Sequence, residues 1–155
     1  MVRIFCAALL AALSAADIKK LEIPAAGLAA LLGIVIVWVP PEDIAGNLPA
    51  CMLVWACFLL TAFICGLLER PAPFGMGDAA VFGILALQLG TAGLFSVFAL
   101  SGILAGIAAA VLLLLKKVRA DSQIPYVPFI AVSYAVCSVI AATATAGTLW
   151  PPAGR

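Results

Sequence analysis

Long runs without a charged residue divide this chain, and they constrain its fold more than any other feature. Five such runs are present: Ile4–Ala16, Ile23–Pro41, Asn47–Leu68, Ala79–Leu115 and Ser122–Gly154. A helix needs about 20 apolar residues to cross the hydrocarbon core of a membrane. Soluble domains carry about 25% charged residues, whereas this chain of 155 residues carries 10% and is 66% hydrophobic. We therefore predict an integral membrane protein. The composition excludes a soluble globular domain, a disordered chain and a nucleic-acid binder.

The fourth run, Ala79–Leu115, is too long for one crossing. The stretch Gly90–Gly93 offers a tight turn inside it, which divides the run into helices near Asp78–Gly90 and Leu94–Leu115. The whole chain, residues 1–155, is thus predicted as a single all-α domain, an integral membrane bundle of six transmembrane helices.

The basic residues indicate how this bundle is oriented. Loops one, three and five of a six-helix bundle lie on one side, and they hold six of the eight Lys and Arg residues: Lys19, Lys20, Arg70, Lys116, Lys117 and Arg119. Short cytoplasmic loops collect Lys and Arg. We therefore predict a multi-pass protein of the cytoplasmic (inner) membrane with both termini on the outer side.

An alternative for the first helix is a cleaved signal peptide, because Arg3 precedes an apolar stretch that ends in Ser14-Ala15-Ala16. Two lysines directly after such a cut disfavour export, whereas they suit a retained helix with a cytoplasmic end. Without this helix, the basic loops and the other loops no longer alternate between the two sides of the bundle. We therefore retain it as the first transmembrane helix.

The absence of histidine limits the chemistry that the chain supports. It excludes His-ligated haem or zinc and any nucleophile that depends on a histidine base. The five cysteines all lie inside apolar runs without a C-x-x-C pair, so we interpret them as small packing side chains. No metal, nucleotide or organic cofactor is expected.

Two carboxylates at the membrane edge, Asp17 and Asp78, are the candidate functional residues. Carboxylates there are costly, and both belong to short helices on the predicted cytoplasmic side. Met1–Asp17 and Asp78–Gly93 span only about 25 Å each, against a hydrocarbon core of about 30 Å. Their helix ends are therefore expected to be recessed at the same depth. Two close carboxylates share a proton, so that one acts as a base on water and the other as an acid.

Each aspartate also has a purely structural interpretation. Asp78 follows Gly75-Met76-Gly77 at the start of a helix, where it can cap the backbone N–H groups. Asp17 can pair with Lys19 or Lys20 in a polar loop. Composition alone favours these structural roles. Elsewhere, Gly102 and Gly106 form a G-x-x-x-G stretch that we expect to serve packing within the bundle.

Three stretches resemble the type IV prepilin peptidases, the G-x-G-D aspartic proteases of the inner membrane. The resemblance is strongest to the short form that serves Flp-type (tight-adherence) pili. The stretches are Asp17-Ile18-Lys19-Lys20-Leu21-Glu22-Ile23-Pro24, Gly75-Met76-Gly77-Asp78, and Ile124-Pro125-Tyr126-Val127-Pro128-Phe129. Their order and their places in the six-helix layout match the family. The chain departs from it at Ala80, where Lys is usual, and at Ala25, where Asn is usual.

The resemblance implies a membrane aspartic endopeptidase with Asp17 and Asp78 as its catalytic pair. Its substrate is then a pilin precursor with a basic leader and a hydrophobic helix, cut after a glycine at the cytoplasmic face. Gly75, Gly77 and Pro24 are expected to position the loops, and Pro125 and Pro128 to lie in the first turn of the last helix. Membrane lipid is the other expected partner, and the oligomeric state is left open. The alternative is a non-enzymatic membrane assembly or transport subunit, or an inactive paralogue, in which the two aspartates are structural.

Overall fold

The computed structural model describes residues 1–70, 75–117 and 124–145, and over these residues it contains helices and no strand. The five helices are α1 (Val2–Lys20), α2 (Ala25–Trp38), α3 (Pro41–Leu67), α4 (Met76–Leu114) and α5 (Val127–Thr145). The all-α prediction is confirmed for this part of the chain. The number of helices differs from the six that were expected.

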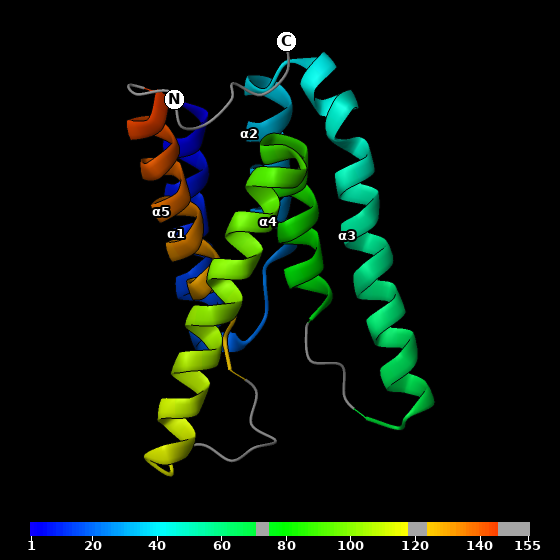
Figure 1. Cartoon of the computed structure of the whole chain (residues 1–155), viewed down its shortest axis with the longest axis vertical. Helices are drawn as coiled ribbons and strands as arrows, with labels where there is room; N and C mark the ends of the chain where they lie inside the picture. The colour runs from blue at the N-terminus through cyan, green and yellow to red at the C-terminus, as the bar shows by residue number, and fades with distance from the viewer. Residues whose placement is uncertain (71–74, 118–123, 146–155) are drawn as a thin grey trace.

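A break inside α4 accounts for this difference. Gly90 alone departs from helical geometry there, with φ 65° and ψ −174°. The rings of Phe82 and Phe98, on either side of the break, have centroids 5.3 Å apart, whereas a straight helix would separate these residues by about 24 Å. The chain therefore reverses at the break, and the two parts of α4 lie side by side (Figure 1). The predicted turn Gly90–Gly93 is reduced to one residue, so no loop separates the two helical parts.

Asn47 stabilises the break from α3. Its Nδ2 atom donates a hydrogen bond of 3.0 Å to the carbonyl oxygen of Leu87. Leu87 lies in the last turn before the break. The Asn47 side chain thus attaches α3 to the part of α4 that precedes Gly90.

Two helix boundaries differ from the expected ones for clear local reasons. α1 continues past Ala16 to Lys20, so Asp17 lies within its last turn; Lys19 and Lys20 suit the negative end of a helix. α3 begins at Pro41 rather than Asn47, because Pro41 occupies the first helical position and Glu42 and Asp43 follow in the first turn.

The last helix begins later than predicted. Ile124 to Tyr126 are not helical, and α5 starts at Val127. Pro125 therefore lies before the helix, which corrects the prediction that it belongs to the first turn, whereas Pro128 does lie there. Both ends of the predicted run Ser122–Gly154 fall outside the described residues.

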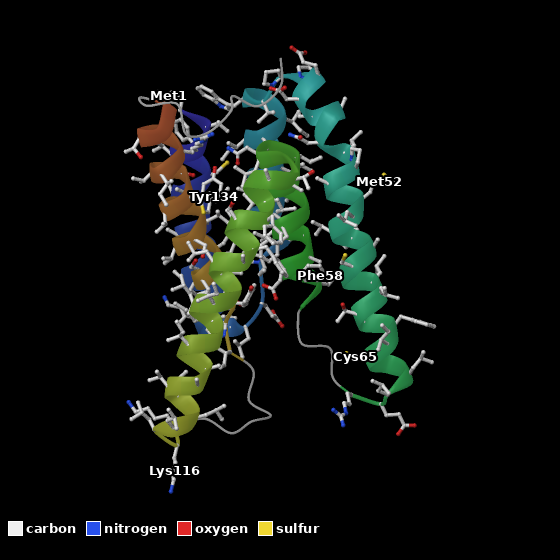
Figure 2. The ribbon with its side chains drawn as sticks, in the orientation of Figure 1. Met1, Met52, Phe58, Cys65, Lys116 and Tyr134 are labelled. Carbon is white, nitrogen blue, oxygen red and sulfur yellow. The ribbon has the colours of Figure 1, made fainter. Side chains whose placement is uncertain are left out.

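α4 is the centre of the packing. It contacts α2, α3 and α5, while α1 packs against α2 and α5. Figure 2 shows Phe58 on the side of α3 that faces α4, and its ring centroid lies 6.1 Å from that of Phe82. Gly102 and Gly106 are exposed, and a Cβ at Gly106 would meet no atom within 4 Å. The expected packing role of this G-x-x-x-G stretch within the bundle is therefore wrong.

Many apolar side chains cover the outside of the bundle. Among the described residues, two helices are long and apolar enough to cross a membrane; the most apolar 18-residue segment of α3 has a mean hydropathy of 2.3 and that of α4 2.6. Only 6% of the most apolar α3 segment is buried inside the protein. Exposed side chains such as Met52, Phe63 and Leu67 are at least 64% accessible. These features indicate an association with a membrane.

Candidate active site

Asp17 is held at the junction of α1 and α5. Asp17 is only 6% exposed, and its Oδ2 atom accepts a hydrogen bond of 3.0 Å from the backbone N–H of Val127. Val127 is the first residue of α5, so the carboxylate lies at the positive end of that helix. The structural role that the sequence suggested, pairing with Lys19 or Lys20, is thus replaced by a bond to a distant helix start.

The first turn of α5 explains why this bond is needed. The carbonyl oxygen of Tyr126 accepts from the N–H groups of Phe129 and Ile130, and Pro128 has no N–H. The N–H of Val127 is one of the donors that a helix start leaves without an intrahelical partner. Asp17 supplies that partner, so the carboxylate acts as a cap from another helix.

Asp78 lies in the first turn of α4. Its Oδ2 atom accepts a hydrogen bond of 3.0 Å from the N–H of Gly75, the residue that precedes the helix. This is one half of a capping box, and the positive end of α4 favours a negative charge here. The geometry therefore includes the capping role suggested for Asp78, and it leaves the second carboxylate oxygen available.

The helix ends that carry the two aspartates lie at a similar level. Figure 1 shows the end of α1 and the start of α4 there, recessed from the far ends of α3 and α4. The charge of Asp17 also acts repulsively on Asp78, although α1 and α4 are far apart in the sequence. Each carboxylate is bonded to the backbone at a different helix start, Asp17 to Val127 and Asp78 to Gly75.

Gly77 packs closely against the connection between α1 and α2. A Cβ at this position would lie 2.7 Å from Cδ1 of Ile23 and 3.2 Å from its Cβ. Ile23 belongs to the connection between α1 and α2, directly before Pro24, the extended residue that precedes α2. Only glycine lets the first turn of α4 and this connection pack so tightly.

Gly75 has a different environment. A Cβ there would lie 3.4 Å from Oδ2 of Asp78, an ordinary contact, and its φ of −78° is open to other residues. Of the two glycines in the G-x-G-D stretch, Gly77 is therefore the one at which a side chain would clash.

Ser101 and Tyr126 were not expected at the site. The hydroxyl of Tyr126 lies 3.1 Å from Oγ of Ser101, and the charge of Asp78 acts on Tyr126. Tyr126 stands inside the third resembling stretch, but nothing in the sequence connects it with Ser101 in α4. Only the fold brings these two residues together.

A second polar group lies further along α5. The hydroxyl of the buried Tyr134 (labelled in Figure 2) donates a hydrogen bond of 2.9 Å to Oε1 of Gln88. Three buried polar atoms, namely Gln88 Nε2, Ser133 Oγ and Ser138 Oγ, have no partner among the described residues.

All five cysteines are free thiols. Within the described residues, no three side chains of Cys, Asp or Glu lie close enough together to hold a metal ion. Comparison of the chain with protein-family models, curated proteins and solved structures finds no match.

Proposed function

We propose that this chain is a membrane-embedded aspartic endopeptidase with Asp17 and Asp78 as its catalytic pair. The observation that carries the proposal is that the end of α1, which holds Asp17, and the start of α4, which holds Asp78, lie at a similar level (Figure 1). The repulsive effect of the Asp17 charge on Asp78 agrees with this placement. The three stretches that resemble prepilin peptidases support it, because the fold connects them. The N–H of Val127 donates to Asp17, and Gly77 packs against Ile23. The charge of Asp17 acts on Asp78.

The proposed topology has six crossings, because the two antiparallel parts of α4 each count as one. The chain then spans the inner membrane with both termini on the outer side. Lys116, at the far end of α4, and Met1 lie at opposite ends of the molecule (Figure 2), as this topology requires. The recessed aspartates are then near the cytoplasmic face.

The proposed reaction is hydrolysis of a peptide bond. The ionised carboxylate takes a proton from a water molecule, which attacks the carbonyl carbon while the protonated carboxylate donates to the carbonyl oxygen. Collapse of the tetrahedral intermediate breaks the C–N bond, and the amine leaves with a proton from the pair. The N–H groups of Val127 and Gly75 hold one oxygen of each carboxylate during these steps.

The proposed substrate is a pilin precursor. Such a precursor joins a basic cytoplasmic leader to a hydrophobic helix, so its cleavage site lies at the depth of the recessed aspartates. Removal of the leader after a glycine then releases the mature pilin on the membrane side.

The test is cleavage of a co-expressed Flp-type pilin precursor, followed by mass. The parent protein is expected to cut after the leader glycine, whereas Asp17→Asn and Asp78→Asn insert normally and do not cut. Asn preserves the size of the side chain and removes its ionisation. If the parent cuts no pilin precursor of its own genome, or if either variant retains activity, the proposal is wrong.

The second candidate is a non-enzymatic membrane assembly subunit or an inactive paralogue. One observation favours it: each aspartate accepts a backbone N–H at a helix start, which is a sufficient structural reason for its presence. In that case the Asn variants assemble and function like the parent.

A further inference from the structure

Two adjacent residues connect the surroundings of both aspartates. The N–H of Val127 donates to Oδ2 of Asp17, and the side chain of Tyr126 lies within the electrostatic influence of Asp78. The position of this Tyr126–Val127 pair therefore affects the geometry around Asp17.

The hydroxyl of Tyr126 is attached to the second part of α4. The Oγ atom of the fully buried Ser101 donates to the carbonyl oxygen of Phe98 at 2.9 Å. This bond uses the only proton on Ser101, so in the 3.1 Å contact Tyr126 donates and Ser101 accepts. Burial raises the pKa of Tyr126 above its ordinary value. The hydroxyl consequently keeps its proton at neutral pH.

The ring of Tyr126 adds contacts to this attachment. Its centroid lies 6.1 Å from that of Phe82 and 6.4 Å from that of Phe129. The backbone around it is poor in donors, because Pro125 and Pro128 have no N–H. The side chain of Tyr126 thus supplies much of the attachment that the backbone at the start of α5 lacks.

We propose that Tyr126 is a positioning residue for Asp17. Its hydroxyl, bound to Ser101, holds the start of α5 where the N–H of Val127 meets the carboxylate. The catalytic consequence rests on the proposed peptidase function, whereas the effect on the Val127–Asp17 bond does not depend on it.

The variants Tyr126→Phe and Ser101→Ala each remove the hydroxyl contact and preserve most of the packing. Loss of one hydrogen bond corresponds to about a fivefold to tenfold effect. We expect kcat for leader cleavage to fall by about this factor with KM unchanged, and the Val127 amide to exchange its proton about tenfold faster. Tyr134→Phe is the matched control, because it removes the buried hydroxyl of a tyrosine further along α5 and its bond to Gln88.

The experiment measures hydrogen exchange by mass spectrometry and cleavage kinetics on the full chain in detergent micelles. Faster exchange at Val127 in Tyr126→Phe and Ser101→Ala, but not in Tyr134→Phe, supports the proposal. Unchanged exchange at Val127 in both variants overturns it. If the parent cuts no precursor, the peptidase function fails and the exchange data alone decide the role of Tyr126. If the parent cuts and Tyr126→Phe keeps the parental kcat, the peptidase function stands and the catalytic consequence of the Tyr126–Ser101 bond is wrong.

Discussion

The carboxylate of Asp17 accepts a hydrogen bond of 3.0 Å from the backbone N–H of Val127, a residue 110 positions further along the chain. A side chain in the last turn of α1 thus caps the start of α5. For a candidate catalytic residue this has a practical meaning, because replacing Asp17 changes both charge and structure. Variants of Asp17 have to separate these two effects.

Asp17→Asn and Asp17→Ala are expected to differ in stability while both lose cleavage. The amide oxygen of Asn still accepts from Val127, whereas Ala leaves a buried N–H without a partner, at a cost of about 1–3 kcal/mol. Thermal unfolding of the purified proteins in the same detergent measures the difference. Glu22→Ala is the control, because Glu22 is an exposed carboxylate of the neighbouring connection. Equal stability of the Ala and Asn variants would show that the Val127 bond contributes nothing.

The sequence predicts those parts of the fold that depend on local preference. The uncharged runs predict helices because apolar stretches of this length suit no other structure in a membrane. The reversal near Gly90 is also predictable, since glycine marks turns. The exact ends of α1 and α3 are harder to predict, because residues such as Lys19 and Pro41 allow a helix to extend beyond its apolar run.

The candidate site is predictable only in its residue types. Asp17 and Asp78 stand out because a carboxylate near a membrane needs a reason. Val127, which donates to Asp17, and Ser101, which contacts Tyr126, do not stand out, because both are ordinary residues of apolar helices. Contacts between residues so far apart in sequence depend on how the helices pack, and hydropathy carries no information on that. The exposed Gly106 shows the same limit, since its G-x-x-x-G spacing wrongly predicted packing within the bundle.

Gly77→Ala is expected to damage the site through Ile23. The added Cβ would lie 2.7 Å from Cδ1 of Ile23, so the first turn of α4 has to move away from the connection between α1 and α2. Overpacking of this kind costs about 1–3 kcal/mol, and a shift of about 1 Å at a catalytic group can reduce a rate about 100-fold. Cleavage by the variant, relative to the parent, measures the effect.

Gly106→Ala and the double variant Ile23→Val/Gly77→Ala are the controls for this prediction. A Cβ at Gly106 meets no atom within 4 Å, so that substitution is expected to leave cleavage unchanged. Val lacks the Cδ1 atom that the Gly77→Ala methyl would strike, so the double variant is expected to recover part of the loss. Strictly additive effects of the two substitutions would contradict a direct contact.

Gly90→Ala is expected to destabilise the reversal inside α4. Its φ of 65° and ψ of −174° lie in a region open essentially to glycine, and other residues there cost about 1–3 kcal/mol. The added Cβ would also lie 2.8 Å from Oδ1 of Asn47, the side chain that bonds to Leu87. We expect a lower unfolding temperature in detergent and a weaker Phe82–Phe98 contact.

The control for this last prediction lies next to Asn47 in α3. Gly46→Ala adds the same methyl where no atom lies within 4 Å, and alanine favours a helix more than glycine by about 1 kcal/mol. It is therefore expected to keep or slightly raise the unfolding temperature. Asn47→Asp separates the bond from the backbone strain, because a carboxylate cannot donate to the Leu87 carbonyl. If Asn47→Asp and Gly90→Ala both unfold like the parent, the one-residue reversal at Gly90 does not need the support of α3.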